Sequence, residues 1–201
     1  MINKYIKSIV LFLIIIILLC SFLSSCKSNK RIVYTDHHTY LLCRSGENAR
    51  KEFRNKCGMN EDIFPAELKD KWSISNYIMI YYNPFDPQYL GYIVIDFPED
   101  DYLLEVKRLQ SYPSTNYIGV YGISGFSDYK LLAINADSYY GIIYALTDCR
   151  SKIIYIELIF CNYYMDLDYR KYIPDEYLPD DFNASINNST REKYEHNWYM
   201  R

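Results

Sequence analysis

The sequence predicts an α+β fold in which a twisted antiparallel sheet of five or six strands packs on one main helix, with short helices nearer the N-terminus. Several short runs between residues 76 and 160 alternate apolar and polar side chains, a pattern typical of half-buried strands. The turns between the later runs are too short for parallel crossovers, so the pairing should be antiparallel. One segment, 100–109, has helical spacing instead and carries charges that suit a helix at both ends.

Six segments are expected to be strands. In the second of them Ile93, Ile95 and Phe97 share one face. Tyr92 and Val94 share the other face, so that the strand has two distinct sides. The six segments are 77–82, 91–97, 117–123, 130–136, 140–147 and 152–160.

The main helix is expected at 100–109. Acidic residues stand at its start and basic residues near its end, where the helix dipole favours each sign of charge. Leu103, Val106 and Leu109 form an apolar stripe that should be buried against the sheet. Shorter helices are expected at 49–57 and 65–72.

The first 26 residues have the pattern of an export signal that ends in a lipid attachment site. Lys4 and Lys7 give a positive start, and residues 9–20 are an unbroken apolar run. The following Leu-Ser-Ser-Cys, which ends at Cys26, resembles the lipobox of bacterial lipoproteins. That resemblance implies cleavage before Cys26 and attachment of diacylglycerol and palmitate to this cysteine. The lipid would then anchor the chain to a membrane of the cell envelope, facing away from the cytoplasm.

An uncleaved transmembrane helix is the alternative for this segment. The uncharged stretch 8–25 has 18 residues, which is near the lower limit for a membrane span. The small residues directly before Cys26 favour cleavage instead. Either interpretation places the rest of the chain outside the cytoplasm.

With this signal the chain divides into four parts. Removal of residues 1–25 takes away two lysines and no acidic residue, so the net charge changes from −3 to −5. An acidic chain argues against nucleic acid as a partner, because such proteins need a basic surface. The parts are 1–25 as the signal peptide, 26–45 as the lipidated cysteine and tether, 46–182 as an α+β globular domain, and 183–201 as a polar C-terminal tail.

The end of the chain contains several aromatic residues. Two similar segments, 174–177 and 179–182, each combine a proline, two acids and an aromatic residue, which suits two short helical turns pinned by Tyr177 and Phe182. In the tail, Tyr194, Trp198 and Tyr199 could dock as a last helical turn or stay mobile.

Histidine is scarce, which limits catalytic and metal chemistry. His37 and His38 are adjacent and could bind a metal, but zinc sites usually need three or four convergent ligands and the remaining His196 lies in the tail. We therefore expect no metal and no cofactor, with His37 and His38 on a polar loop or edge strand. None of the histidines lies near a recognisable nucleophile motif, and no glycine-rich phosphate loop occurs.

Asp166 and Asp168 lie on one side of an extended segment. Paired carboxylates can serve glycoside hydrolysis or bind calcium. No further ligand spacing accompanies them, so the sequence favours solvated acids at the end of a strand.

An exposed tyrosine face is the remaining candidate for a binding site. If the aliphatic face of each strand packs on the helix, then Tyr92, Tyr117, Tyr121 and Tyr155 lie on the opposite, solvent-accessible face. Aromatic platforms stack on sugars and are enriched at protein interfaces. The alternative is that tyrosine simply suits exposed sheet positions.

These observations predict a membrane-anchored cell-envelope lipoprotein with a non-catalytic module that binds an envelope polymer or another protein. The alternative is a surface-tethered hydrolase that uses acidic residues or histidine. A cleft that gathers two or more acids or histidines would favour the hydrolase, whereas a flat tyrosine face would favour binding.

Four cysteines follow the lipobox, in a compartment that permits disulfides. The last two predicted strands should form a hairpin, with Cys149 in its turn and Cys161 beyond the far end of the returning strand. The two would then lie roughly 30 Å apart, whereas a disulfide needs Cα atoms within about 7 Å. We therefore expect no bond between them, and the other pairings with Cys43 and Cys57 stay open.

Overall fold

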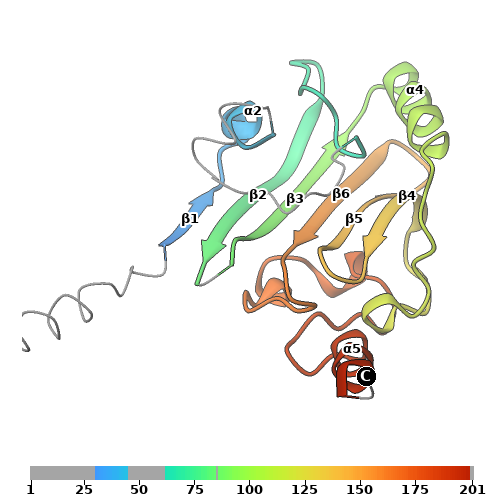
Figure 1. The fold of residues 1–201 in the computed structure, drawn as a ribbon. Helices are drawn as coiled ribbons and strands as arrows, with labels where there is room; N and C mark the ends of the chain where they lie inside the picture. The colour runs from blue at the N-terminus through green and yellow to red at the C-terminus, as the bar shows by residue number, and fades with distance from the viewer. Residues whose placement is uncertain (1–29, 45–61, 85, 200–201) are drawn as a thin grey trace, which may run out of the picture. The chain divides into compact units, whose positions relative to one another are not determined.

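The computed structural model describes residues 30–44, 62–84 and 86–199 (Figure 1). Cys26, Cys57 and the predicted helix 49–57 lie outside the described residues. The chain divides into two compact units, residues 1–30 and 31–201, and the second holds the folded body.

One six-stranded sheet forms the centre of this body. Its strands are β1 (Lys30–Tyr34), β2 (Ser73–Asn83), β3 (Gln88–Asp96), β4 (Lys130–Asp137), β5 (Gly141–Thr147) and β6 (Lys152–Ile159). They lie in the order β1-β2-β3-β6-β5-β4, and the pairings from β2 to β4 are all antiparallel. The α+β class and the antiparallel sheet are therefore confirmed.

Helices and 3-10 turns surround the sheet. They are η1 (His37–Thr39), α2 (Tyr40–Arg44), α4 (Glu99–Gln110), η2 (Val120–Gly122), η3 (Tyr169–Lys171), η4 (Asp175–Tyr177) and α5 (Ser189–Tyr199). The segment expected as a tether thus includes an edge strand and α2, and the segment expected as a polar tail is mostly α5. The segment 65–72 contains turns and bends, so the helix predicted there is wrong.

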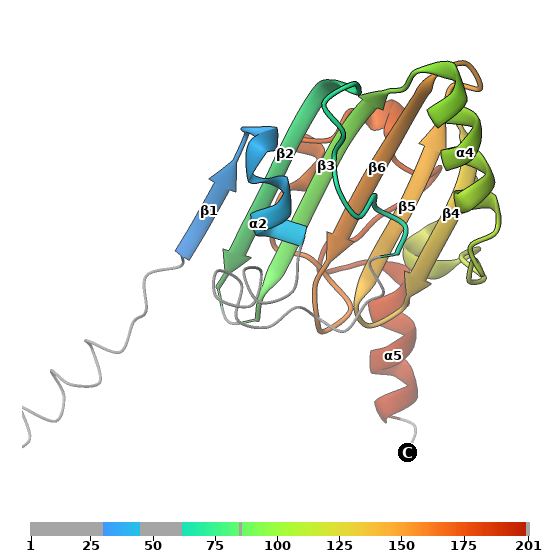
Figure 2. The same ribbon diagram turned by 90° about the horizontal axis from the view of Figure 1, so that it is seen from above.

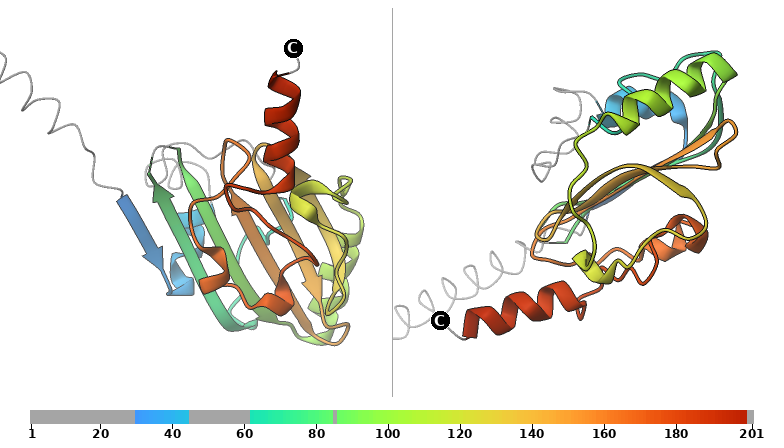
Figure 3. Two further views of the ribbon diagram at one scale, coloured as in Figure 1. Left: turned by 90° about the horizontal axis from the view of Figure 1, so that it is seen from below. Right: turned by 90° about the vertical axis from the view of Figure 1, so that its right-hand side faces the viewer.

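Both faces of the sheet are covered, which gives the body three layers (Figure 3). On one face α2, α4 and the segment 62–72 pack on side chains that include Ile93 and Ile95 (Figure 2). On the other face η2 and the segment 160–184 pack on side chains that include Tyr92. The alternation predicted for β3 is thus confirmed. Packing on one main helix is not confirmed, and the expectation of an open sheet face is wrong.

The helix α4 begins with acidic residues and ends with basic ones as predicted, but it buries a different stripe. Tyr102 and Leu109 are buried, whereas Leu103 is 59% exposed and Val106 is half-buried. The Tyr102 hydroxyl lies 2.8 Å from the Thr147 hydroxyl of β5. This hydrogen bond turns Tyr102, and not Leu103, toward the sheet.

A second hydrogen-bond network joins α4 to the sheet and to the segment 62–72. The Tyr155 hydroxyl donates to Glu105 Oε1 at 2.6 Å. Arg108 forms an ion pair with the same carboxylate and donates to the carbonyl of Ile63 at 2.7 Å. Polar contacts therefore set the orientation of α4, which hydrophobic spacing alone did not reveal.

Asp101 anchors the start of α4 to the same segment. Its carboxylate accepts a hydrogen bond from Trp72 Nε1 at 2.6 Å and lies 2.8 Å from Lys71 Nζ. The hydrogen bond from Lys71, and then that from Trp72, lowers the pKa of Asp101. Such a carboxylate stabilises the fold above its unfolded-state pKa of about 4, and this stabilisation is lost as the pH falls through the folded-state pKa.

Asp101→Asn should therefore remove part of the acid dependence of stability. The variant loses the ion pair, so it should be less stable than wild type at pH 7, and the difference should shrink below about pH 4. Thermal melts between pH 7 and pH 3 measure this difference. Asp100→Asn removes an exposed acid from the same turn and should keep the wild-type profile. If the melting temperature of Asp101→Asn falls with pH in parallel with that of wild type, then the ionised Asp101 carboxylate does not contribute to the acid dependence of stability.

Residues 117–123 do not form the predicted strand. Gly119 and Gly122 adopt positive φ angles of 80° and 85°, and Tyr121 between them has φ 51°. The glycines turn the chain at this point because they enter the left-handed region without steric cost. Tyr121 is thereby directed into the core, where its hydroxyl donates to the carbonyl of Ser138 at 2.6 Å.

The hairpin of β5 and β6 is confirmed. In its turn, Asp148 Oδ1 accepts hydrogen bonds from the backbone N–H groups of residues 150–152. Cys149 lies in this turn and Cys161 lies beyond the far end of β6. No disulfide joins these two cysteines, as predicted.

Candidate functional site

The four tyrosines predicted as a binding face do not form an exposed platform. Tyr92, Tyr121 and Tyr155 are buried, and Tyr117 is half-buried against the ring of Phe126. Tyr155 lies on the same face as α4, together with Ile153 and Ile159 of β6, whereas the alternate residues of that strand face the other layer. Tyr92 faces the layer of residues 117–129 and 160–184, which the sequence did not predict as a cover, and Tyr117 and Tyr121 belong to that layer themselves.

Asp166 and Asp168 are both exposed, and neither lines either of the two pockets described below. Asp166 Oδ2 accepts a hydrogen bond from Gln88 Nε2 at 2.8 Å. Gln88 Oε1 in turn accepts from the backbone N–H groups of Asp166 and Leu167. This closed pair fixes the segment to the start of β3, which is a structural role for Asp166.

A different set of aromatic rings reaches the surface beside α5. We call it the aromatic ladder: Tyr139, Tyr163, Tyr194 and Trp198. Tyr163 meets Tyr139 edge-on at 5.1 Å and stacks on Tyr194 with centroids 4.1 Å apart. Trp198 follows at 6.3 Å from Tyr194. Tyr194 is 41% exposed and Trp198 is 65% exposed, so the outer end of the ladder is open to solvent.

Figure 3 shows α5 next to η2. The ladder borders a groove of about 410 Å³ between α5 and the segment around η2. Four residues of α5 at helical spacing turn one face toward the groove. The lining contains both polar and apolar side chains, so the groove offers both hydrogen bonds and ring contacts. The lining residues are Ile118, Gly119, Val120, Ser138, Tyr163, Thr190, Lys193, Tyr194 and Asn197.

Asn188 holds the base of this groove together. Its side chain is fully buried, and Oδ1 accepts hydrogen bonds from the N–H groups of Thr190 and Arg191, so it caps α5. Its Nδ2 donates to the carbonyl of Tyr163 at 2.7 Å. One side chain therefore fixes both the helix and the ladder tyrosine that stacks on it.

The backbone at Tyr163 is strained. Asn162 and Tyr163 have φ angles of 62° and 68°, a left-handed conformation that non-glycine residues adopt at a cost of about 1 kcal/mol or more each. Asn188 and the stacking on Tyr194 hold this conformation. Partial burial, followed by the neighbouring Tyr194 and Tyr139, raises the pKa of Tyr163, so its hydroxyl keeps its proton further into the alkaline range.

Asn188→Ala should therefore lower the free energy of unfolding by about 1–2 kcal/mol, because it removes the cap and leaves the Tyr163 carbonyl without this donor. Asn188→Asp keeps the cap acceptor but puts a buried carboxylate oxygen against the carbonyls of Tyr163 and Ser185, so it should be destabilised as well. Denaturant unfolding monitored by circular dichroism measures both. If Asn188→Ala is as stable as wild type, Asn188 does not organise the groove.

A second pocket of about 330 Å³ lies between η1, α2 and the segment 62–72. His37 and His38 line it together with Asp70, so this pocket gathers two histidines and an acid. The sequence placed His37 and His38 on a loop or edge strand, and they lie just after edge strand β1, in η1. The pocket itself could not be predicted, because Asp70 approaches from a distant segment.

The residues of the groove were not predicted as a site. Tyr194 and Trp198 were noted only as a helical turn that could dock, and Tyr139 and Tyr163 were not singled out. The spacing of Thr190, Lys193, Tyr194 and Asn197 was the available signal, because such positions share one face of a helix.

Comparisons with known proteins give no match: no family model, no curated protein and no solved structure is similar to this chain. Among the helices of the described residues, none combines the length and the apolar character that a membrane span requires.

Proposed function

We propose that this chain is a membrane-anchored cell-envelope lipoprotein whose folded body is a non-catalytic binding module for an envelope polysaccharide. The observation that carries the proposal is the aromatic ladder beside a groove with polar side chains. The anchor rests on the first 26 residues, with Cys26 as the lipidated residue.

The chemistry of the groove suits a sugar better than a purely apolar ligand. A sugar ring has an apolar C–H face and a rim of hydroxyl groups. Tyr163 and Tyr194 offer ring contacts for the first. Ser138, Thr190 and Asn197 offer hydroxyl and amide groups for the second. The groove volume also lies within the usual range for small-ligand sites, which suits one or a few sugar units.

The ladder is arranged before a ligand arrives. Tyrosine and tryptophan have few rotatable bonds, and stacking on a neighbour restricts them further. Less conformational entropy is then lost on binding, which raises affinity for a given contact area. The strained backbone at Tyr163 is consistent with such a site, since strain gathers where geometry serves a ligand.

Co-sedimentation of the full-length chain in detergent with insoluble cell-wall polysaccharide tests this proposal. We expect saturable binding that soluble fragments of the same polysaccharide compete away. An absence of binding across the polymers of the envelope would refute the proposed ligand class.

Cys26→Ala should abolish lipid attachment and leave the precursor unprocessed. Without the sulfur no diacylglycerol can be added, and cleavage in this class follows that addition. Labelling of cells with a radioactive fatty acid, together with the size of the product, measures both effects. Cys149→Ala removes an exposed cysteine from the body and is the control. Normal labelling and processing of Cys26→Ala would contradict the lipobox assignment.

The alternative is a surface-tethered hydrolase. The criterion given for it is met, because one pocket gathers His37, His38 and Asp70, whereas the flat tyrosine face expected of a binding module is absent from the described residues. Asp166 and Asp168, the acids first considered for it, do not line that pocket. If the chain releases soluble sugars from the polymer and His38→Ala abolishes the release, the hydrolase replaces the binding module.

A further inference from the structure

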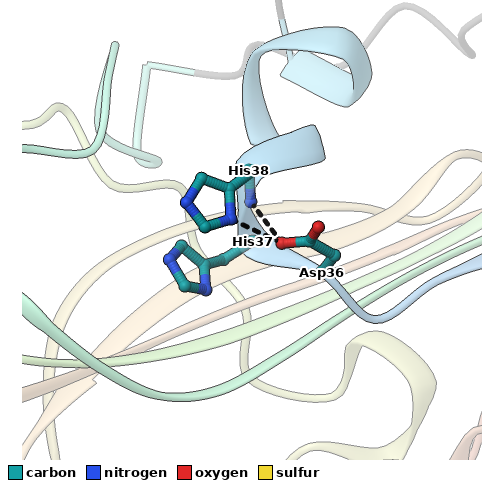
Figure 4. Close-up of side chains that lie close together, drawn as sticks. All are labelled: Asp36, His37 and His38. Atoms are coloured by element: carbon teal, nitrogen blue, oxygen red, sulfur yellow. Dashed lines mark hydrogen bonds and ion pairs between the residues drawn. The ribbon is translucent and has the colours of Figure 1, made fainter.

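Three potential metal ligands lie together in η1 and at its N-cap (Figure 4). One ligand atom each of Asp36, His37 and His38 lies within 4.8 Å of the other two. The two imidazole rings are stacked, with centroids 4.4 Å apart and planes inclined by 27°. A tight turn therefore brings together three side chains that an extended strand would send in alternate directions.

Asp36 fixes the orientation of the His38 ring. Its Oδ1 accepts hydrogen bonds from the His38 backbone N–H at 3.0 Å and from His38 Nδ1 at 2.7 Å. Thr39 Oγ1 donates to the Asp36 carbonyl at 2.6 Å and so steadies the same turn. When Nδ1 carries the proton toward Asp36, Nε2 of His38 is the nitrogen with a free lone pair. In Figure 4 each ring has a nitrogen on the side away from Asp36.

We infer that Asp36, His37 and His38 form a binding site for a late first-row transition-metal dication such as Zn²⁺. His37 and His38 are the ligands, and Asp36 is the carboxylate that holds His38 in place and supplies negative charge. A carboxylate on the second ring nitrogen is the usual arrangement for a metal-binding histidine. Imidazole nitrogens suit zinc, copper and nickel, whereas calcium and magnesium require a larger set of oxygen ligands.

The surroundings of the site are compatible with a dication. Asp70 and Lys69 both line the same pocket, so their charges offset each other, and the Lys69 ammonium lies over the ring of Trp72, 5.2 Å from its centroid. Two protein nitrogens leave coordination positions open to water. The site would therefore resemble exchangeable metal sites with open positions more than closed structural ones.

This site was not predicted from the sequence because only three histidines are present and His196 lies in α5. In the structure the third group of the cluster is not a histidine but the carboxylate of Asp36, which directly precedes His37 in the sequence. The side chains of His38 and Asp36 are 81% and 65% exposed, so substitutions there should leave the core intact.

Titration of the untagged full-length chain in detergent with CoCl₂, followed by the visible absorption of bound cobalt and by displacement with ZnCl₂, tests the inference. Wild type should bind one cobalt ion saturably. His37→Ala and His38→Ala should each weaken binding at least tenfold, and Asp36→Ala by about 10- to 100-fold. His196→Ala removes the third histidine and should bind like wild type.

Failure of wild type to bind would overturn the inference. Unchanged binding by the double variant His37→Ala/His38→Ala would overturn it as well. If His196→Ala loses as much cobalt affinity as His38→Ala, the binding does not depend on this particular cluster, and the inference is overturned. Matching melting temperatures for the variants and wild type would confirm that lost binding does not reflect unfolding.

Discussion

Replacing Gly141 with alanine is expected to lower the free energy of unfolding by about 4 kcal/mol, enough to unfold a large share of a marginally stable domain. Gly141 begins β5 with φ 107°, a conformation that side chains with a Cβ atom rarely adopt. An added Cβ would lie 2.1 Å from the carbonyl oxygen of Leu158 and 3.0 Å from a ring carbon of Phe160. The oxygen belongs to β6 in the middle of the sheet, so it can move away only if the strand pairing is disturbed.

Gly119→Ala provides the matched control. Gly119 also has a positive φ, 80°, but an added Cβ there meets open space. Gly119→Ala should lower the free energy of unfolding by only about 1–2 kcal/mol, the cost of placing alanine in the left-handed backbone conformation. Denaturant unfolding of both variants separates the steric clash from the backbone preference. Equal losses for the two variants would contradict the close approach of β5 and β6 at Gly141.

Trp198→Ala and Tyr194→Ala should each weaken binding of soluble cell-wall oligosaccharides at least about tenfold. Exposed aromatic side chains that stack on a ligand typically contribute more than 1 kcal/mol, and about 1.4 kcal/mol corresponds to a factor of ten. Trp198 is the clearer of the two tests, because it is the more exposed and its removal leaves the contact between Tyr163 and Tyr194 in place.

Isothermal titration calorimetry on the full-length chain in detergent measures these affinities. Leu104→Ala removes an apolar side chain that is 67% exposed on α4, and it should bind like wild type. If Trp198→Ala binds the oligosaccharide as tightly as wild type, then the aromatic ladder is not part of the binding site. A loss in Leu104→Ala as large as that in Trp198→Ala would show that the effect is not specific to the ladder.

The parts of the fold that depend on local alternation could be predicted from the sequence. The two faces of β3 and the hairpin of β5 and β6 follow from period-two patterns and a short turn. The burial of Tyr177 and Phe182 in the repeated acidic segments was also correctly predicted, with a 3-10 turn at the first of them. In each case the signal lies within a few consecutive residues.

The second covering layer could not be predicted, because residues 160–184 have little regular secondary structure and no period. Their backbone is fixed by contacts such as the buried ring of Tyr169 against Phe182. Without this layer the sequence left Tyr92 and Tyr121 facing water. The orientation of α4 was missed for a related reason, since polar contacts of Tyr102 and Glu105 determine it.

The candidate groove was missed because its parts are distant in the sequence. Ile118, Ser138, Tyr163 and α5 meet only when the second layer is in place. The left-handed backbone at Tyr163 has no sequence signal of its own, because tyrosine rarely adopts this conformation, although the preceding Asn162 is of a type that does. The histidine cluster differs, because its three members are consecutive, and only their convergence and the adjoining pocket required the structure.

Hydrogen exchange of the full-length chain, with and without the cell-wall polysaccharide, tests the proposed binding site most directly. Protection is expected in the segments that build the groove and the ladder, namely around residues 118–120, 138–139, 163 and 189–198. The backbone around His38 and Asp70 should exchange at the same rate in both states. Protection at His38 and Asp70 with none along α5 would contradict the assignment and place the ligand in the other pocket.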